Sequence, residues 1–184
     1  MNFVSRAGEK LQFALTHFKI SPKGLIVADF GSSTGGFVDS LLQNGAEKVY
    51  SVDTSYGTLD WKIRNDPRVV VLERTNAMHV TLPEKMDLIT VDTSWTRQSK
   101  VLPNVLANLK PGGIVISLIK PHYEADRKHL RQGRLQDEFM GQTLERVKED
   151  VKLANFDLLD QTQSPITGEK GGNIEYLFLL RVAN

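Results

Sequence analysis

The apolar positions of this chain follow two alternating patterns. Short, nearly continuous runs of valine, isoleucine, leucine and phenylalanine are typical of strands buried on both faces of a sheet. Between them lie segments whose apolar positions recur every three or four residues, as on one face of a helix. Strands are predicted at residues 25–30, 48–52, 69–72, 86–91, 113–119, 156–159 and 175–182. Helices are predicted at residues 8–18, 37–43, 58–64 and 101–109, with a long amphipathic segment at 136–153.

The order of these elements predicts an α/β fold. Strands that alternate with helices pair in parallel through right-handed crossovers. The last two strands are joined instead by a loop at residues 164–173 without a helical pattern, so one strand should be antiparallel. We therefore predict a mostly parallel seven-stranded sheet with one antiparallel strand near the C-terminus and helices on both faces. Residues 1–20 are predicted to form an N-terminal helical extension carrying Lys10, and residues 21–184 the main domain.

Composition removes several classes of function. The 184 residues are 40% hydrophobic and 24% charged, the balance of an ordinary globular domain. The absence of cysteine excludes disulfides, thiolate zinc sites and cysteine nucleophiles, and fits a cytoplasmic protein. No apolar run reaches the length of a membrane span, and the four histidines lack metal-ligand spacing, so we expect neither a membrane nor a metal. Because the net charge is only +1, binding of nucleic acid would need a local basic patch.

A glycine-rich loop directly follows the first predicted strand and indicates a nucleotide-like cofactor. Such ligands bind α/β sheets at the carboxyl ends of the strands. The next strand ends at Asp53, where a carboxylate can accept hydrogen bonds from ribose hydroxyls. The loop, residues 31–36, reads G-x-x-x-G-G and not the G-x-G-x-x-G of dinucleotide sites, which favours S-adenosylmethionine. The alternative is a tight strand–helix turn in which Asp53 is an ordinary cap.

A polar stretch after the third strand, where an adenine edge would lie, extends the predicted cofactor site. Taken alone, this stretch is equally well explained as a polar loop. The predicted S-adenosylmethionine contacts are Asp29, Gly31, Ser32, Ser33, Thr34, Gly35, Gly36, Phe37, Asp53, Thr75, Asn76, Ala77 and Asp92.

Charged residues at the ends of the fourth and fifth strands are candidates for catalysis. Asp92 and Lys120 should lie at the same rim as the glycine loop, because parallel strands end at one edge of the sheet. A lysine at the mouth of a buried strand is unusual, since burying an unpaired ammonium is costly. Lys10 and Glu175 are further candidates. Each of the four residues, taken alone, is more often a surface charge than a catalyst.

Two exclusions narrow the acceptor of a methyl group to an alkyl oxygen. The fourth strand ends in Asp-Thr-Ser-Trp at residues 92–95, unlike the D-P-P-Y type of sequence used for amino groups of bases, and ring-carbon methylation commonly needs a cysteine. A ribose hydroxyl must lose its proton as the methyl group moves. A neutral Lys120 could take that proton if burial and Lys10 depress its pKa. Asp92 and Glu175 act in the opposite direction on that pKa, so we expect them to orient the two lysines.

Many ordered motifs point to one family. They lie at residues 4–11, 31–36, 49–53, 61–69, 73–76, 109–113, 120–124, 164–166 and 172–176. With them, the sequence resembles the TlyA-type, haemolysin-like branch of the FtsJ-like ribosomal RNA methyltransferases over nearly its whole length. The resemblance implies a Rossmann-like class I methyltransferase domain at residues 21–184, S-adenosylmethionine as cofactor, and ribosomal RNA or ribosomal subunits as partners. It also implies that the family's Lys-Asp-Lys-Glu tetrad for ribose 2′-O-methylation falls on Lys10, Asp92, Lys120 and Glu175.

The sequence departs from the family pattern at three places. Residues 92–95 replace the usual Asp-Val-Ser-Phe, and a basic stretch at 128–134 replaces a glycine-rich one. Family members typically carry an N-terminal RNA-binding module, and this sequence begins about where that module would end. Basic residues at 127–134 and 62–68, with Arg6 and Arg97, could line an RNA path or form a solvated face.

Two other functions remain as alternatives. The first is a non-catalytic RNA-binding or ribosome-assembly protein that retains the fold, which an intact tetrad disfavours. The second is a nicotinamide-dependent oxidoreductase, which the spacing of the glycine loop disfavours. Trp61 and Trp95 are predicted to be packing residues more than platforms for base stacking. Nothing in the pattern indicates an oligomeric state.

Overall fold

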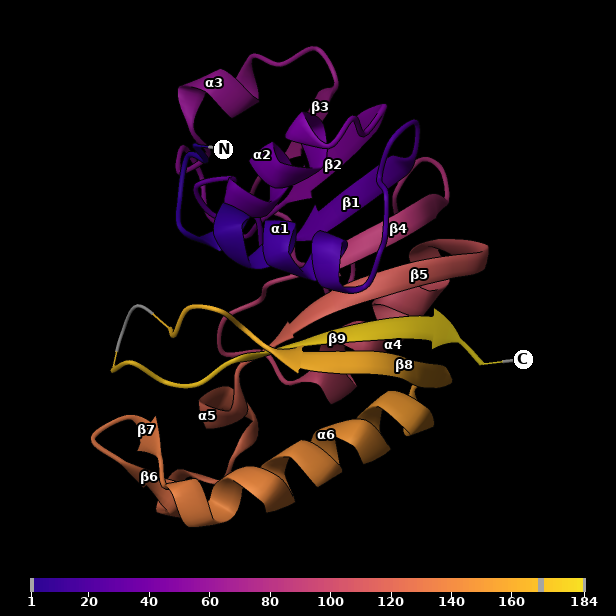
Figure 1. The fold of residues 1–184 in the computed structure, drawn as a ribbon. Helices are drawn as coiled ribbons and strands as arrows, with labels where there is room; N and C mark the ends of the chain where they lie inside the picture. The colour runs from indigo at the N-terminus through magenta and orange to yellow at the C-terminus, as the bar shows by residue number, and fades with distance from the viewer. Residues whose placement is uncertain (1, 169–170, 184) are drawn as a thin grey trace.

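The computed structural model describes residues 2–168 and 171–183, and its centre is one twisted sheet (Figure 1). The strands of this sheet are β1 (Ile26–Phe30), β2 (Lys48–Val52), β3 (Val69–Leu72), β4 (Met86–Val91), β5 (Leu109–Ile119), β8 (Phe156–Gln163) and β9 (Tyr176–Val182). Their order across the sheet is β3-β2-β1-β4-β5-β9-β8. The first five pair in parallel, whereas β9 is antiparallel to both of its neighbours. The predicted fold class is therefore confirmed.

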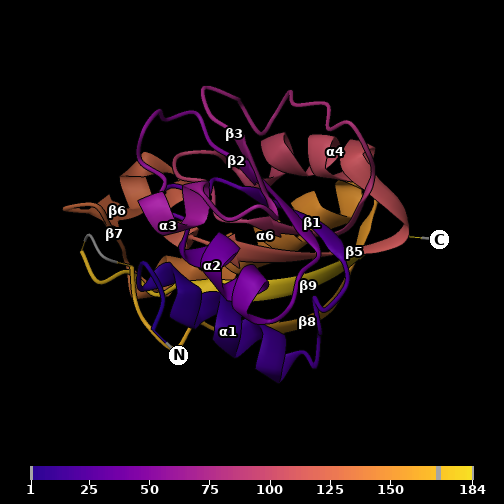
Figure 2. The same cartoon turned by 90° about the horizontal axis from the view of Figure 1, so that it is seen from above.

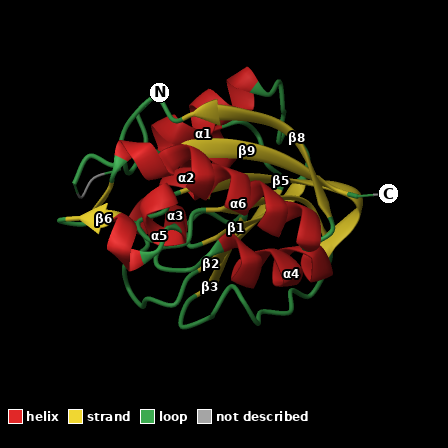
Figure 3. Cartoon of the chain, turned by 90° about the horizontal axis from the view of Figure 1, so that it is seen from below, coloured by secondary structure: helices red, strands yellow, loops and turns green. Residues whose placement is uncertain are grey.

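Helices cover both faces of the sheet. One face carries α1 (Ala7–His17), α2 (Gly36–Gln43) and α3 (Trp61–Arg64), which lie toward the viewer in Figure 2. The other carries α4 (Gln98–Asn108) and α6 (Met140–Leu153), seen from below in Figure 3. Side chains of β1 alternate between the two cores: Val27 packs on the α1 side and Phe30 on the α4 side. Both of these side chains are fully buried.

A smaller set of elements follows β5 on the polar rim of the sheet. It consists of α5 (Pro121–Glu124), a short antiparallel hairpin of β6 (Leu130–Arg131) and β7 (Arg134–Leu135), and two single turns of 3-10 helix at Arg127–His129 and Asp137–Phe139. Sequence patterning indicated only a basic, polar stretch here. Strands of two residues carry too little periodicity to be recognised.

The structure corrects the start of β5. This strand begins at Leu109 and not at residue 113, so the Lys-Pro-Gly-Gly segment is an irregular part of the strand and not a turn. The register with β4 shifts between Met86 and Leu88, which face Leu109 and Ile114, and Gly112 has a φ of +75°. A bulge in a strand needs a residue that tolerates positive φ, and Gly112 supplies it. Because turns favour glycine for the same reason, the sequence was interpreted as a turn.

Four other boundaries differ from the prediction by more than one residue, and the first is that of α4, which begins at Gln98 and not at residue 101. The helix predicted at 58–64 begins only at Trp61, because the Asp60 side chain accepts the backbone N–H of Lys62 at 2.8 Å and caps it. The helix in the 136–153 segment begins at Met140. β8 continues beyond residue 159 to Gln163, through polar residues that pair with β9 although they give no hydrophobic signal.

Helix α1 packs directly on α2, with Leu11, Ala14 and Leu15 buried in the shared core. The division at residue 20 into an extension and a main domain stays a prediction. What the packing does establish is the position of Lys10, which faces the polar rim of the sheet from a buried site. Across residues 2–168 and 171–183, no helix combines the length and apolar character that crossing a bilayer requires.

Candidate active site

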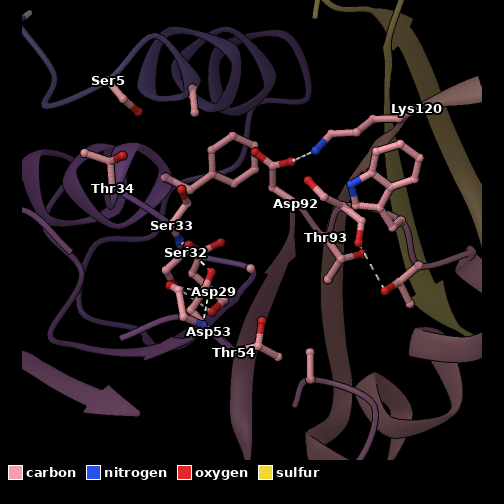
Figure 4. A pocket seen from close by; sticks show the side chains of 18 of the residues that line it. Ser5, Asp29, Ser32, Ser33, Thr34, Asp53, Thr54, Asp92, Thr93 and Lys120 are labelled. Carbon is pink, nitrogen blue, oxygen red and sulfur yellow. Dashed lines mark hydrogen bonds and ion pairs between the residues drawn. The ribbon is translucent and has the colours of Figure 1, made fainter. Parts of the chain in front are cut away.

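A cavity of about 800 Å³ opens at the carboxyl ends of the central strands. It lies where the strand order reverses between β1 and β4, the position at which α/β sheets bind nucleotide-like ligands. Its walls come from the segment before α1, the glycine loop after β1, and the residues that follow β2, β4 and β5. In Figure 4, Asp29, Asp53 and Ser33 cluster at one end of the cavity, and Asp92 and Lys120 face each other at the other.

The glycine loop after β1 packs closely against the backbone of the residue that follows β4. Gly31 has a φ of +94°, and a Cβ on it would lie 2.5 Å from the carbonyl oxygen of Asp92. The later glycines serve packing instead: a Cβ on Gly36 would lie 2.2 Å from the Ser5 hydroxyl, and one on Gly35 would meet Leu59. Of the predicted cofactor contacts, all line the cavity except three, which are Gly35, Gly36 and Thr75.

Asp53 holds the glycine loop against the end of β2. Its Oδ2 accepts the backbone N–H of Ser33 at 2.8 Å, and its Oδ1 accepts the N–H and hydroxyl of Ser55 at 2.7 and 2.6 Å. The carboxylate is only half-buried, so it can accept further donors from the cavity. Asp53 thus combines a capping role in the loop with a position suited to ribose hydroxyls.

Asp29 presents an unsatisfied carboxyl oxygen at the same end. The Thr90 hydroxyl donates to Oδ1 at 2.6 Å, whereas the buried Oδ2 has no hydrogen-bond partner among the described residues. Burial raises the pKa of Asp29 to about 7, because hydrogen bonds from Thr90 and Ser32 offset only part of the desolvation. A buried acceptor without a partner suits an N–H or ammonium group of a ligand.

Two lysine–carboxylate pairs lie at the other end of the cavity. Lys120 Nζ lies 2.5 Å from Asp92 Oδ1, and Lys10 Nζ lies 2.5 Å from Glu175 Oε2. All four side chains are largely buried, with exposures between 3% and 16%, and all four line the cavity. They come from α1, from the ends of β4 and β5, and from the residue before β9. The structure therefore brings together the four residues that the sequence singled out.

The pKa of Lys120 is raised, and the expectation of a depressed value is wrong for this structure. Burial alone would lower it. The attraction and hydrogen bond of Asp92, with a further contribution from Glu175, outweigh burial and favour the ammonium form. Nearby His122 shows the opposite balance: burial and the charge of Lys120 lower its pKa to about 4, so its imidazole is neutral at neutral pH.

Comparison with known proteins identifies the family. A family model described as FtsJ-like methyltransferase matches residues 3–182. The chain belongs to the FtsJ-like family. YqxC of Bacillus subtilis is 40% identical over an alignment of 189 positions, which covers 98% of this chain and 66% of that protein. The 16S/23S rRNA (cytidine-2′-O)-methyltransferase TlyA of Mycobacterium tuberculosis is 36% identical over 185 residues, which cover 97% of this chain and 68% of TlyA.

A solved structure agrees with these relatives. A protein from Streptococcus thermophilus superposes with a TM-score of 0.96 at 35% identity, over 100% of this chain and 68% of that one. This FtsJ-like chain thus spans about two thirds of the length of the relatives that it matches. Among residues 2–168 and 171–183, no three His, Cys, Asp or Glu side chains are grouped so that they could hold a metal ion.

Sequence patterning missed one wall of the FtsJ-like cavity, the segment before α1. Its residues Val4, Ser5 and Arg6 line the cavity, and the backbone N–H of Val4 donates to Asp39 Oδ2 at 2.9 Å. Asp39 is buried on the first turn of α2. The sequence signals in this segment were the motif at residues 4–11 and the basic Arg6. Neither predicted the contact with Asp39, because a contact over 35 residues leaves no local pattern.

Two tryptophans also differ from prediction. Trp61 and Trp95 are 77% and 84% exposed, so neither is buried in a core. Trp95 has a φ of +60° and its ring lies on that of Tyr123, with centroids 4.5 Å apart. Both Trp95 and Tyr123 line the cavity. A loop that follows a strand gives no hydrophobic period from which the exposure of its aromatic residue could be read.

Proposed function

We propose that this chain is an S-adenosylmethionine-dependent methyltransferase that modifies a ribose 2′-hydroxyl of ribosomal RNA. The observation that carries the proposal is the placement of two buried lysine–carboxylate pairs in the cavity that the glycine loop also lines. The FtsJ-like family and the relative TlyA, named as an rRNA (cytidine-2′-O)-methyltransferase, support the same chemistry.

The cavity fits the proposed cofactor in its donors and acceptors. Asp53 would accept the ribose hydroxyls, and the unsatisfied oxygen of Asp29 would accept the ammonium of the methionine part. Asn76 and Ala77 line the wall proposed for the adenine. When bound, S-adenosylmethionine supplies a methyl group activated by a sulfonium. The chain then has to orient the acceptor hydroxyl and move its proton.

The two ion pairs divide that task in the mechanism we propose. Asp92 fixes the Nζ of Lys120, and Glu175 fixes that of Lys10. Lys120, at the mouth of β5, first releases one ammonium proton to bulk water, and its neutral amine then accepts the proton of the hydroxyl as the oxygen takes the methyl group. Lys10 donates hydrogen bonds that hold the acceptor ribose. Because both amines are paired within a largely buried site, their positions are set before the RNA arrives.

The experiment that tests this function is transfer of a labelled methyl group to ribosomal subunits and to protein-free ribosomal RNA. A ribose 2′-O-methyl group blocks alkaline cleavage at its own linkage, so the label should appear in alkali-resistant dinucleotides. Label in a methylated base would contradict the proposal. Binding of RNA without any transfer would favour the non-catalytic RNA-binding alternative.

Replacing Asp53 with alanine is expected to weaken S-adenosylmethionine binding by about tenfold to a hundredfold, since hydrogen bonds to a charged group and the anchoring of Ser33 are both lost. Isothermal calorimetry measures the change. Asp60→Ala is the matched control, because Asp60 caps α3 and does not line the cavity. Equal affinity of the Asp53 variant and the wild type would rule out this contact.

A further inference from the structure

The β6–β7 hairpin displays cations that have no acidic partner within the described part of the chain. Gln132 and Gly133 have φ values of 50° and 77°, the left-handed pair that closes a tight two-residue turn. Arg131 and Arg134 flank this turn, and both are exposed. Neither makes an ion pair with any residue in the described ranges 2–168 and 171–183, and the same holds for the adjacent residues Arg127 and Lys128.

The other basic segment, residues 62–68, differs in this respect. Arg64 pairs with Glu73, Arg68 with Asp66 at 2.7 Å, and Lys62 lies 3.6 Å from Asp39. These charges are neutralised within the protein. Of the two basic segments predicted to line an RNA path, the hairpin segment therefore offers the cations that are available to phosphates, which supply most of the affinity in nucleic-acid binding.

A buried asparagine ties this hairpin to the loop between β8 and β9. Asn173 Nδ2 donates to the carbonyl of Gly133 at 3.1 Å, and its Oδ1 accepts the N–H of Leu135 at 3.3 Å. In the same loop, a Cβ on Gly171 would lie 3.4 Å from Cγ of Arg134. Figures 1 and 2 both show the hairpin beside this loop. One side chain, 6% exposed, thus contacts both the turn of the hairpin and β7.

The loop also carries an active-site carboxylate. Glu175 follows Asn173 by two residues and pairs with Lys10. The backbone carbonyl of Asn173 accepts the N–H of Gly168 at 2.9 Å, and Gly168 itself lies against the Glu175 carboxylate, with a Cβ position 2.8 Å from Oε1. The position of the hairpin and the position of the Lys10–Glu175 pair are therefore set by the same short piece of backbone.

We propose that the β6–β7 hairpin binds backbone phosphates of the RNA and that Asn173 is a positioning residue, which fixes the hairpin relative to the Lys10–Glu175 pair. The inference rests on the proposed function and deepens it. Two strands of two residues are too short to keep a fixed orientation by their own hydrogen bonds. Through Asn173, RNA held at Arg131 and Arg134 is aligned with the amine of Lys10.

The hairpin is tested with the double variant Arg131→Ala/Arg134→Ala in the full chain, with ribosomal RNA as the probe. We expect weaker RNA binding and a slope of log Kd against log salt that is smaller by about 1.4 to 1.8, since each phosphate contact contributes about 0.7 to 0.9. Lys19→Ala/Lys23→Ala removes two exposed charges near the amino end of β1 and should leave both values unchanged. Equal slopes for the two double variants would overturn the phosphate assignment.

The positioning role of Asn173 is tested by comparing the effect of its replacement on kcat with the effect on RNA affinity. Asn173→Ala is expected to lower kcat about tenfold while the Kd values for RNA and S-adenosylmethionine stay within about twofold, because the two lost hydrogen bonds position the hairpin and contact neither ligand. Hydrogen exchange of residues 130–135 should accelerate. Asn173→Asp keeps the oxygen that accepts the Leu135 N–H and should retain more activity than the alanine variant, which guards against a result due to misfolding.

A triple variant tests whether Asn173 and the two hairpin arginines contribute to catalysis through the same interaction. If Asn173 connects the hairpin to Glu175, adding the two arginine replacements to Asn173→Ala should lower kcat by less than the product of the separate effects. Independent, multiplicative losses would overturn the positioning role. If wild-type protein transferred no methyl group, the salt slopes and hydrogen exchange would still test the hairpin, so failure of the proposed function is distinguishable from failure of this inference.

Discussion

Replacing Lys120 with methionine is expected to lower the rate of methyl transfer by about 10²- to 10⁴-fold, the range over which a positioned acid or base acts. Methionine keeps most of the apolar stem that packs at the end of β5 and removes only the amine. Because Lys120 lies at the end of the cavity away from Asp53, affinity for S-adenosylmethionine should change by less than about threefold. Single-turnover rates at saturating cofactor, with calorimetry for binding, separate the two effects.

The matched control lies on β5, the strand that Lys120 directly follows. Lys110 is also paired with an aspartate, at 2.7 Å from Asp87, but at the opposite end of β5 from the cavity. Lys110→Met should leave transfer unchanged, because this pair touches no wall of the site. Unchanged turnover in the Lys120 variant would remove this residue from the mechanism. An equal loss of rate in both variants would indicate damage to the fold instead of to the chemistry.

The role of Lys120 as a base also predicts the direction of the pH dependence. Its pKa is raised in this structure, so the neutral amine is the minor form at neutral pH. The population of that form grows about tenfold with each pH unit below the pKa, and the single-turnover rate should grow with it. A rate that is flat from neutral to alkaline pH would exclude Lys120 as the base and leave its ammonium with an orienting role.

Local pattern was sufficient for the half of the site nearest the cofactor. One strand–helix–strand unit contains the apolar strand that ends around Asp29, the glycine loop and Asp53. The carboxyl ends of its parallel strands must lie at the same edge of the sheet. For that reason the same logic placed Asp92 and Lys120 together. The sequence could not show which glycines of the loop face the cavity. Gly36 packs against Ser5 and Gly35 against Leu59, and in sequence such packing glycines look the same as glycines that contact a ligand.

The remaining features depended on distances between remote segments. Lys10 and Glu175 are separated by 165 positions, and the sequence joined them only through the family resemblance. The sign of the pKa change at Lys120 could not be predicted either, since burial and the charge of Asp92 oppose each other and the 2.5 Å separation decides the outcome. The contact of Asn173 with the hairpin was not predicted: the sequence marked this residue only as part of the motif at 172–176, because its partners belong to a hairpin with no recognisable pattern.

Replacing Lys10 with methionine is expected to destabilise the fold by about 3–5 kcal/mol, the usual result of leaving one member of a buried ion pair unpaired. The Glu175 side chain is 3% exposed, and its partner is the only ammonium within salt-bridge distance among the described residues. The change also loosens the link between α1 and the start of β9. Urea denaturation followed by circular dichroism measures the free energy of unfolding. Lys148→Met, which breaks an exposed pair with Glu145 on α6, should change it little.

The double variant Lys10→Met/Glu175→Gln separates stability from chemistry. A buried pair replaced on both sides by neutral groups of similar size often regains the stability that the single change loses, because the desolvation cost of both charges is removed as well. We therefore expect unfolding free energy near that of the wild type and methyl transfer as low as in the single variant. Recovery of both properties would mean that the pair only supports the fold. Recovery of stability alone would show that this buried pair is needed for positioning the acceptor, which is the role that its place in the cavity predicts.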